Sequence, residues 1–269
     1  MKKLIAASAM SVALSFGGAL AVPVDVELQL LVDVSASVSP AEFDLQRDGY
    51  VAAFQSSTVQ NAILNGDIGS IAVQLIYWSQ FAVVAVDWTL IDSAATANAF
   101  ATSIGNAARP PMAGADGVGM GTGIANAIDF GVSEFDFGGD NGFEGTELVM
   151  DVSGDGTENI VNAQGSQASA DAVAEARDNA LGAGVTSING LPILGEEAGI
   201  VAFYTANVIG GDDPFVIPAS SFGDFEPAIT QKLAAEITGT NPVPLPMSAW
   251  LLLSTLGLFG LYVKLRKTA

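Results

Sequence analysis

The chain has 269 residues, 29 of them acidic and nine basic, and it contains neither cysteine nor histidine. This composition excludes disulfides, His-dependent catalytic triads and the usual zinc ligands, so any bound metal must be held by oxygen, as Mg²⁺, Ca²⁺ and Mn²⁺ are. The net charge of −20 argues against nucleic acid or an anionic membrane surface as a partner, and it fits a salt-adapted or extracellular protein.

Residues 1–21 are typical of a secretory signal peptide. Lys2 and Lys3 form a basic start, residues 4–20 are apolar and small, and residues 19–21 supply an Ala-x-Ala cleavage site. We therefore expect an exported protein whose mature chain begins near Val22. An uncleaved N-terminal membrane anchor is the alternative.

A buried strand and an oxygen-rich loop come next. Residues 28–32 favour a strand buried on both faces, and the strand ends in Asp33. Open α/β sheets bind ligands at this end of their strands. Ser35 and Ser37 follow closely enough to converge with Asp33 on one small hard cation. A serine-rich turn that binds nothing is the alternative.

The segment Asp33-Val34-Ser35-Ala36-Ser37 resembles the Asp-x-Ser-x-Ser element of von Willebrand factor A domains. In those domains the element forms a metal-ion-dependent adhesion site, or MIDAS. The resemblance implies that Asp33, Ser35 and Ser37 are metal ligands and that two later loops complete the site.

A helix and a hairpin are predicted after this loop. Ser39 and Glu42 form a capping box that starts a helix at Pro40, which extends to about residue 57. Two β-prone runs, residues 71–78 and 81–88, are joined by only two residues, and so short a connection requires antiparallel neighbours. We expect the second run to be an antiparallel edge strand, as in A domains.

A glycine-rich loop, residues 114–123, follows a predicted helix over residues 93–108. It does not fit the dinucleotide-binding pattern, because it follows two prolines rather than a strand. The resemblance to A domains implies instead that Thr122 gives a hydroxyl to the metal and opens a helix over residues 124–130. A flexible loop with an N-capping threonine is the alternative.

Residues 135–146 are acidic and glycine-rich but lack the EF-hand spacing. They precede a strand, so they should lie at the opposite edge of the sheet from Asp33. We expect a solvated loop there, with an accessory Ca²⁺ site as the alternative.

The following strand, residues 148–153, leads into Gly154-Asp155-Gly156. The resemblance implies that Asp155 approaches the metal, commonly through water, whereas Asp151 is expected to be a structural carboxylate. Residues 151–156 are also typical of a bacterial A-like family described as a domain of unknown function. The further matching segments are residues 77–79, 88–92, 188–192 and 208–211.

The rest of the domain alternates in the same way, with helices over residues 167–181 and 225–237 and strands over residues 185–191 and 215–217. Residues 196–214 are expected to be irregular. We therefore predict an α/β fold in residues 22–238. It is a doubly wound, mostly parallel six-stranded sheet with one antiparallel edge strand and helices on both faces, similar to von Willebrand factor A and Rossmann-like domains.

The C-terminal part is expected to be a sorting segment. Residues 239–246 form a linker with a Val-Pro-Leu-Pro motif, and residues 247–269 combine an apolar run with a basic end. This arrangement resembles the VPLPA-type PEP-CTERM signal, except that Met247-Ser248 follows the second proline. The resemblance implies processing by an exosortase at the membrane. An ordinary anchor with a cytoplasmic C-terminus is the alternative.

Together these features predict an exported cell-surface or extracellular-matrix binding module and not an enzyme. Its divalent cation, Mg²⁺ first and Ca²⁺ or Mn²⁺ next, is expected to engage a carboxylate of a protein or polysaccharide. A phosphatase-like hydrolase with Ser35 or Asp33 as nucleophile is the alternative, and a structural role in a polysaccharide matrix is a third. The basic residues of the domain, Arg47, Arg109, Arg177 and Lys232, fall outside the candidate loops and offer no obvious partner for a phosphate.

Overall fold

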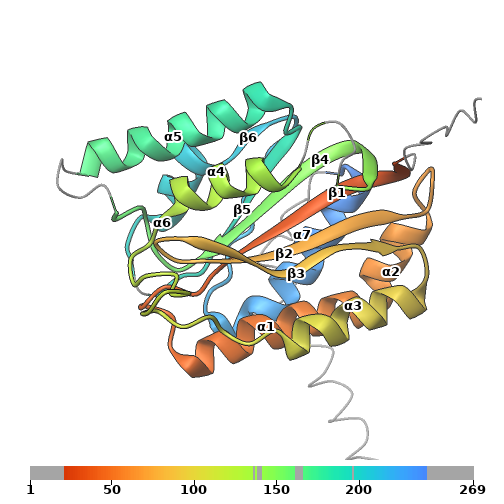
Figure 1. Cartoon of the computed structure of the whole chain (residues 1–269), viewed down its shortest axis with the longest axis horizontal. Coiled ribbons are helices and arrows are strands. Elements are labelled where there is room, and N and C mark those ends of the chain that lie inside the picture. Colours follow the sequence, from red (N-terminus) through yellow and green to blue (C-terminus); the bar gives the residue numbers. More distant parts are fainter. Residues whose placement is uncertain (1–20, 136, 138–140, 161–165, 196, 241–269) are drawn as a thin grey trace, which may run out of the picture.

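The computed structural model describes residues 21–135, 137, 141–160, 166–195 and 197–240. Its centre is a six-stranded sheet with helices on both faces (Figure 1), in the strand order β3-β2-β1-β4-β5-β6. The strands are β1 Val22–Asp33, β2 Ile71–Trp78, β3 Ala82–Ile91, β4 Phe143–Gly154, β5 Ser187–Pro192 and β6 Gly210–Gly211. The doubly wound α/β prediction is confirmed.

The middle of the sheet is parallel. Strand β1 pairs in parallel with β2 on one side and β4 on the other, and β4 pairs in parallel with β5. All eight residues of β2 are buried, which explains their continuous apolar character. Strand β3 lies antiparallel to β2 at the edge of the sheet and is only partly buried, so the hairpin prediction is confirmed.

The other edge differs in detail from the sequence-based expectation. The sixth strand is Gly210–Gly211, and it lies antiparallel to β5. In the predicted strand 215–217, only Val216 forms an isolated bridge, with Gly190. A Gly-Gly pair with a φ of 93° at Gly211 has no strand propensity, and only the tertiary contact with β5 makes it a strand.

Two helical layers enclose the sheet (Figure 1). One layer consists of α1 Pro40–Gln55, α2 Ser57–Leu64, α3 Ala94–Asn106 and α7 Phe225–Thr238, and the other of α4 Ile124–Phe135, α5 Ser166–Ala183 and α6 Ile200–Phe203. The predicted capping box of Ser39 and Glu42 is present at the start of α1. Two α-helices were not predicted. These are α2, which Ser56 caps, and α6, which continues into a π-helical turn, Tyr204–Val208, inside the segment expected to be irregular.

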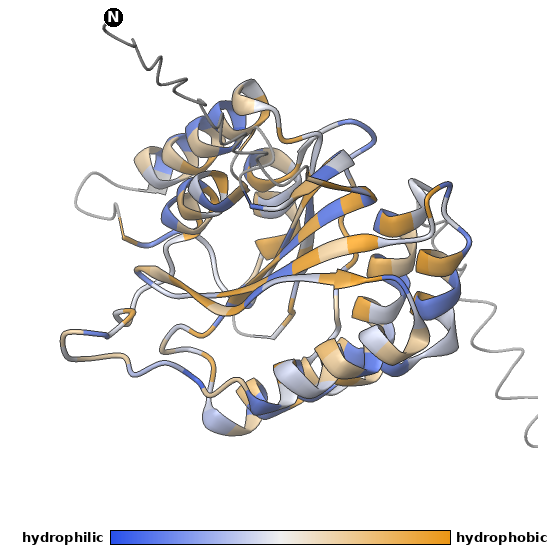
Figure 2. Ribbon diagram, turned by 45° about the vertical axis from the view of Figure 1, so that its right-hand side comes forward, coloured by the Kyte–Doolittle hydropathy of each residue, from blue (hydrophilic) through white to orange (hydrophobic). Residues whose placement is uncertain are grey.

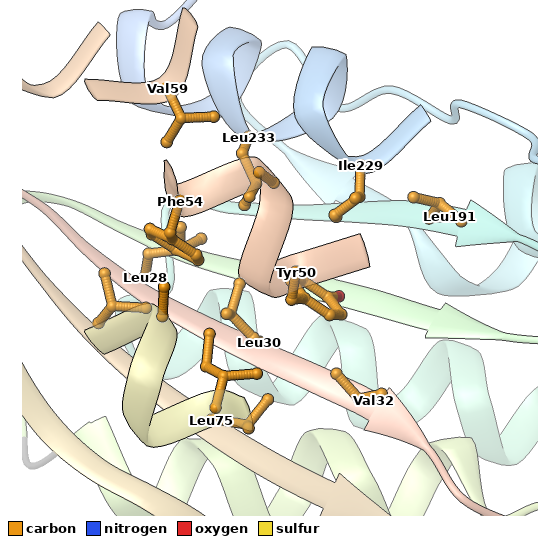
Figure 3. Close-up of a cluster of buried hydrophobic side chains, with 14 of the residues drawn as sticks. Leu28, Leu30, Val32, Tyr50, Phe54, Val59, Leu75, Leu191, Ile229 and Leu233 are labelled. Carbon is orange, nitrogen blue, oxygen red and sulfur yellow. The ribbon is translucent and has the colours of Figure 1, made fainter. Parts of the chain in front are cut away.

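The two faces of the sheet have separate hydrophobic cores. Alternate residues of β1, Leu28, Leu30 and Val32, pack against Tyr50 of α1 and Leu233 of α7 in the first core (Figure 3). Colouring by hydropathy shows apolar strands at the centre and helices striped with polar residues outside (Figure 2). Burial on both faces fixes the register of β1 and hence the position of its last residue, Asp33.

The predicted signal peptide and sorting segment lie outside the described residues, apart from residues 21 and 239–240. Within the described ranges, no helix is both long and apolar enough to cross a membrane. Asp136 and Asp140 of the acidic loop also lie outside these ranges. The loop leads into the amino end of β4, and the backbone N–H of Val22 donates to Gly142, so the loop is at the edge opposite Asp33 as predicted.

Candidate metal centre

The loop between β1 and α1 gathers three of the predicted site residues. The backbone N–H of Ser35 donates to Oδ1 of Asp33 at 2.7 Å, and the hydroxyls of Ser35 and Ser37 are 3.0 Å apart. Asp33 and Ser35 are fully buried, whereas Ser37 is exposed at the rim. The Asp-x-Ser-x-Ser segment thus forms a compact turn that opens to solvent at one hydroxyl.

The loop after β4 adds Asp155. The Ser37 hydroxyl donates to Oδ1 of Asp155 at 2.7 Å, which links the loops that follow β1 and β4. These strands are parallel neighbours, with Val32 opposite Ser153, so their carboxyl ends lie side by side. Two carboxylates that are 122 residues apart in sequence therefore meet at one edge of the sheet.

Thr122 enters from the glycine-rich loop. Its backbone N–H donates to Oδ1 of Asn159 at 2.8 Å, and Nδ2 of Asn159 donates to the Thr122 hydroxyl at 3.2 Å. That hydroxyl would be 3.3 Å from a Cβ at Gly156, beside Asp155. The N–H of Ala36 donates to the Met120 carbonyl at 3.1 Å, which joins this loop to the first one. All five predicted residues thus lie at one junction of three loops.

The electrostatics of this junction suit a cation. Burial, followed by the negative charge of Asp155, raises the pKa of Asp33 to about 7. Oδ2 of Asp33 is buried and accepts no hydrogen bond among the described residues. Two nearby buried carboxylates repel each other unless a proton or a cation joins them.

The donor set fits a hard cation. Two carboxylates and three hydroxyls are oxygen ligands of the kind that Mg²⁺, Mn²⁺ and Ca²⁺ take. Among the described residues, no cluster of three or more Asp, Glu, His or Cys side chains could hold a metal. A metal at this junction would therefore need the hydroxyls as ligands in addition to the two carboxylates.

Arg109 is a site residue that sequence reasoning missed. Its Nη2 donates to three backbone carbonyls of the first loop, those of Val34, Ser35 and Val38, at 2.7–2.8 Å. In the sequence, Arg109 falls outside the candidate loops, and no spacing links it to Asp33. Its rarity, as one of few basic residues in the domain, was the available signal.

Three further polar residues hold the loops in place. Gln46 of α1 donates through Nε2 to the Asp33 carbonyl at 3.1 Å. The Ser79 hydroxyl donates to the Gly121 carbonyl at 2.8 Å, and Asn159 holds Thr122 as described above. The sequence carries no spacing signal for these contacts, because each joins elements that are distant along the chain.

Beside the junction lies a cavity of about 500 Å³. Thr157 and Asn159 line it, which places it next to both Asp155 and Thr122, and the buried Glu158 and Ser169 also contribute to its wall. A larger cavity of about 1030 Å³ lies at the other end of the strands, near Asp25 at the start of β1 and near the end of α7. Only the smaller cavity adjoins the predicted metal ligands.

Asp151 has the structural role expected of it. Its Oδ1 is 2.8 Å from Nζ of Lys232 on α7, and Lys232 also pairs with Glu236 one turn later. All three side chains are fully buried. This cluster ties α7 to β4, well inside the sheet.

The comparisons with known proteins agree with the fold. The model of the family described as "Protein of unknown function (DUF1194)" matches residues 23–241. No curated protein matches the chain in sequence.

Solved structures give the same architecture. Proximal thread matrix protein 1 from the mussel byssus, with a zinc-occupied MIDAS motif, aligns with a TM-score of 0.54 and 16% identity over 81% of this chain and 48% of that one. A von Willebrand factor type A structure from Catenulispora acidiphila aligns with a TM-score of 0.50 and 12% identity, over 80% and 43% of the two chains. The pilus adhesin SpaC from Lactobacillus rhamnosus GG, in its open conformation, gives 0.52 and 14%, over 80% and 30%.

The chain spans about half or less of each of these structures. At such low identity the likeness establishes the fold, which is that of von Willebrand factor A-type domains.

Proposed function

The chain belongs to the family described as "Protein of unknown function (DUF1194)", and we propose that it is an exported adhesion module that engages an acidic partner through a divalent cation. The observation that carries the proposal is the hydrogen-bonded chain from Asp33 through Ser35 and Ser37 to Asp155. It joins two carboxylates and two hydroxyls at the edge of the sheet where α/β folds bind ligands.

In this proposal Asp33, Ser35, Ser37, Thr122 and Asp155 hold the cation, directly or through water. When bound, the cation supplies a local positive charge on a protein whose net charge is −20. Mg²⁺ is our first choice, with Ca²⁺ and Mn²⁺ as alternatives. The zinc in the MIDAS of the mussel protein supports a divalent ion in a related fold.

The residues of this chain prepare the site for such a partner. Arg109 holds the first loop by three carbonyls, so the Ser35 and Ser37 hydroxyls stay in register with Asp155. Met120 is 64% exposed and lies at the rim, where its carbonyl contacts Ala36.

We favour binding over hydrolysis as the role of this site. The nearby cationic group is Arg109, and its Nη2 is already engaged by three carbonyls, so it is poorly placed to neutralise a phosphate. The chain has no histidine to act as a general base. The adhesin and byssus-matrix proteins among the similar folds point in the same direction.

The partner is proposed to offer a carboxylate, from either a protein or an acidic polysaccharide. We also propose that the signal peptide directs export and that the C-terminal segment holds the protein at the membrane until an exosortase releases it. The protein would then act at the cell surface or in the extracellular matrix.

Retention on an immobilised carboxylated polymer tests the proposal. The protein should bind the polymer when Mg²⁺ or Mn²⁺ is present at roughly millimolar concentration. EDTA should elute the protein because it removes the cation. The protein should not bind the methyl-esterified polymer, which lacks free carboxylates. Ser35→Ala should lose retention because it removes a proposed ligand, whereas Ser133→Ala, an exposed serine on α4, should not. Retention that is unaffected by EDTA, or turnover of a generic phosphoester, would contradict the proposal.

A further inference from the structure

A tyrosine outside the predicted ligand set approaches Asp33 of the candidate metal centre. Tyr204 begins the π-helical turn after α6, and it is fully buried in the second core. Its hydroxyl makes no hydrogen bond among the described residues. A buried hydroxyl without a partner is costly, so such a group in a well-packed core calls for an explanation.

Two glycines in adjacent strands make room for this one side chain. A Cβ at Gly190 of β5 would lie 2.8 Å from Cδ1 of Tyr204, and a Cβ at Gly154 of β4 would lie 3.0 Å from its hydroxyl. Gly190 pairs with Val152, two residues before Gly154, so both glycines face the same side of the sheet. Glycine weakens a strand interior and often marks a close approach of another group. Here Gly190 makes room for the ring of Tyr204, and Gly154 makes room for its hydroxyl.

The second group at Gly154 is the metal-site carboxylate. The same Cβ would lie 2.8 Å from Oδ2 of Asp33, which is the carboxylate oxygen without a hydrogen bond among the described residues. A buried donor and a buried acceptor, each lacking another partner in the described structure, thus converge on one glycine. A hydrogen bond between them breaks no existing one.

We propose that Tyr204 is a positioning residue of the metal centre, whose hydroxyl donates to Oδ2 of Asp33 and fixes the orientation of that carboxylate toward the cation. The inference rests on the proposed metal binding and assigns a role to a residue outside the five ligands. Hydrogen bonds to ligating carboxylates orient them, and the loss of such a partner commonly weakens metal affinity by about 10- to 100-fold.

The test compares Tyr204→Phe with Tyr50→Phe in the full chain. Tyr50 is also fully buried, but its hydroxyl lies 3.3 Å from that of Ser153 and away from Asp33. Calorimetric titration with Mn²⁺ should show binding about tenfold or more weaker in Tyr204→Phe and nearly unchanged in Tyr50→Phe. Without metal, Tyr204→Phe should melt no lower than wild type, because the hydroxyl makes no hydrogen bond among the described residues and donates to Asp33 when the cation is bound.

A second readout separates positioning from packing. Metal binding should perturb the ultraviolet absorption of a tyrosine in wild type and Tyr50→Phe, and this signal should be missing in Tyr204→Phe. If Tyr204→Phe fails to fold, Gly154→Ala, whose methyl carbon would lie 2.8 Å from Oδ2 of Asp33 and 3.0 Å from the Tyr204 hydroxyl, should weaken Mn²⁺ binding in its place.

The outcomes are distinguishable. Equal Mn²⁺ affinity in wild type and Tyr204→Phe would overturn the role of Tyr204 alone. An equal loss of Mn²⁺ affinity in Tyr204→Phe and Tyr50→Phe would show that Tyr204 contributes only through packing. A wild-type chain that binds no divalent cation would overturn the metal centre and this inference together.

Discussion

At the scale of single residues, the candidate site brings together two carboxylates whose negative charges repel each other. Asp33 is fully buried next to Asp155, and burial with that neighbouring charge raises its pKa to about 7. The Ser37 hydroxyl links the loop after β1 to Asp155 in the loop after β4. Arg109 holds the backbone of the loop after β1. Unless a cation or a proton joins them, the two acids destabilise the loop junction that they build.

A divalent cation should therefore stabilise the folded protein. At about 100 times its dissociation constant, Mg²⁺, Mn²⁺ or Ca²⁺ should add roughly 2.7 kcal/mol to the free energy of unfolding. For a domain of this size that corresponds to an increase of about 5–10 °C in Tm. Asp33→Ala should abolish most of this shift, and differential scanning fluorimetry measures it.

Asp87→Ala is the matched control, since Asp87 is an exposed carboxylate on the edge strand β3. It should keep the wild-type shift. If Asp33→Ala responds to the cations as wild type does, the serine turn is structural and holds no metal.

At the scale of secondary-structure elements, helix α7 is attached to the sheet by charge as well as by apolar packing. Lys232 lies between Asp151 of β4 and Glu236 of its own helix. Two buried carboxylates share one ammonium group, so a proton must neutralise the excess charge or the cluster is destabilised. Burial first, and then the charge of Asp151, raises the pKa of Glu236 to about 8.

This cluster predicts a pH dependence of stability. The unfolded chain releases the Glu236 proton near the ordinary glutamate pKa of 4.5, but in the folded protein the pKa is about 8. The folded state thus binds more protons in this window, and the stability that this proton contributes is lost as the pH rises from about 4.5 to about 8. Glu236→Gln, which mimics the protonated acid, should remove this component.

Thermal melts of both proteins from pH 5 to pH 9 check this expectation. Asp33 and Asp151 also have raised pKa values and give the same sign, so the difference between wild type and Glu236→Gln isolates the Glu236 contribution. Glu226→Gln, at the exposed start of α7, should leave the profile unchanged. Parallel profiles for wild type and Glu236→Gln would show that Glu236 is ionised in the folded protein.

At the scale of the whole molecule, different features lie at the two ends of the central parallel strands. The predicted ligands gather where β1 and β4 end, and the acidic loop and the larger cavity lie where these strands begin. All 29 acidic residues lie between the basic ends of the chain. If the proposed cation site is correct, this acidic body repels a carboxylate-bearing partner and the bound cation attracts it, which would give the site its selectivity.

The whole-chain arrangement also predicts processing. If the segment from residue 247 is a sorting signal, the mature protein in a host with an exosortase should lack the residues after the Val-Pro-Leu-Pro motif. Mass spectrometry of the native protein should then detect peptides of the described domain but none from residues 250–269. An intact tail in every cell fraction would leave only the membrane-anchor interpretation.

The sequence by itself determined the elements whose signals are local. The apolar run ending in Asp33, the capping box of Ser39 and Glu42, and the short connection of the β2–β3 hairpin each follow from neighbouring residues, and the structure has all three. The same local patterns, together with the family resemblance, selected the five site residues that meet at one edge.

Only the tertiary structure decided the contacts between distant segments. Arg109 on the carbonyls of the first loop, Lys232 against Asp151, Tyr204 at Gly154 and the Gly210–Gly211 strand on β5 each join parts of the chain with no shared local pattern. Their formation depends on the geometry of the folded sheet, which places them together after hydrophobic burial has fixed its register. That dependence is why local patterns and the family resemblance selected the five candidate ligands but not the residues that hold their loops.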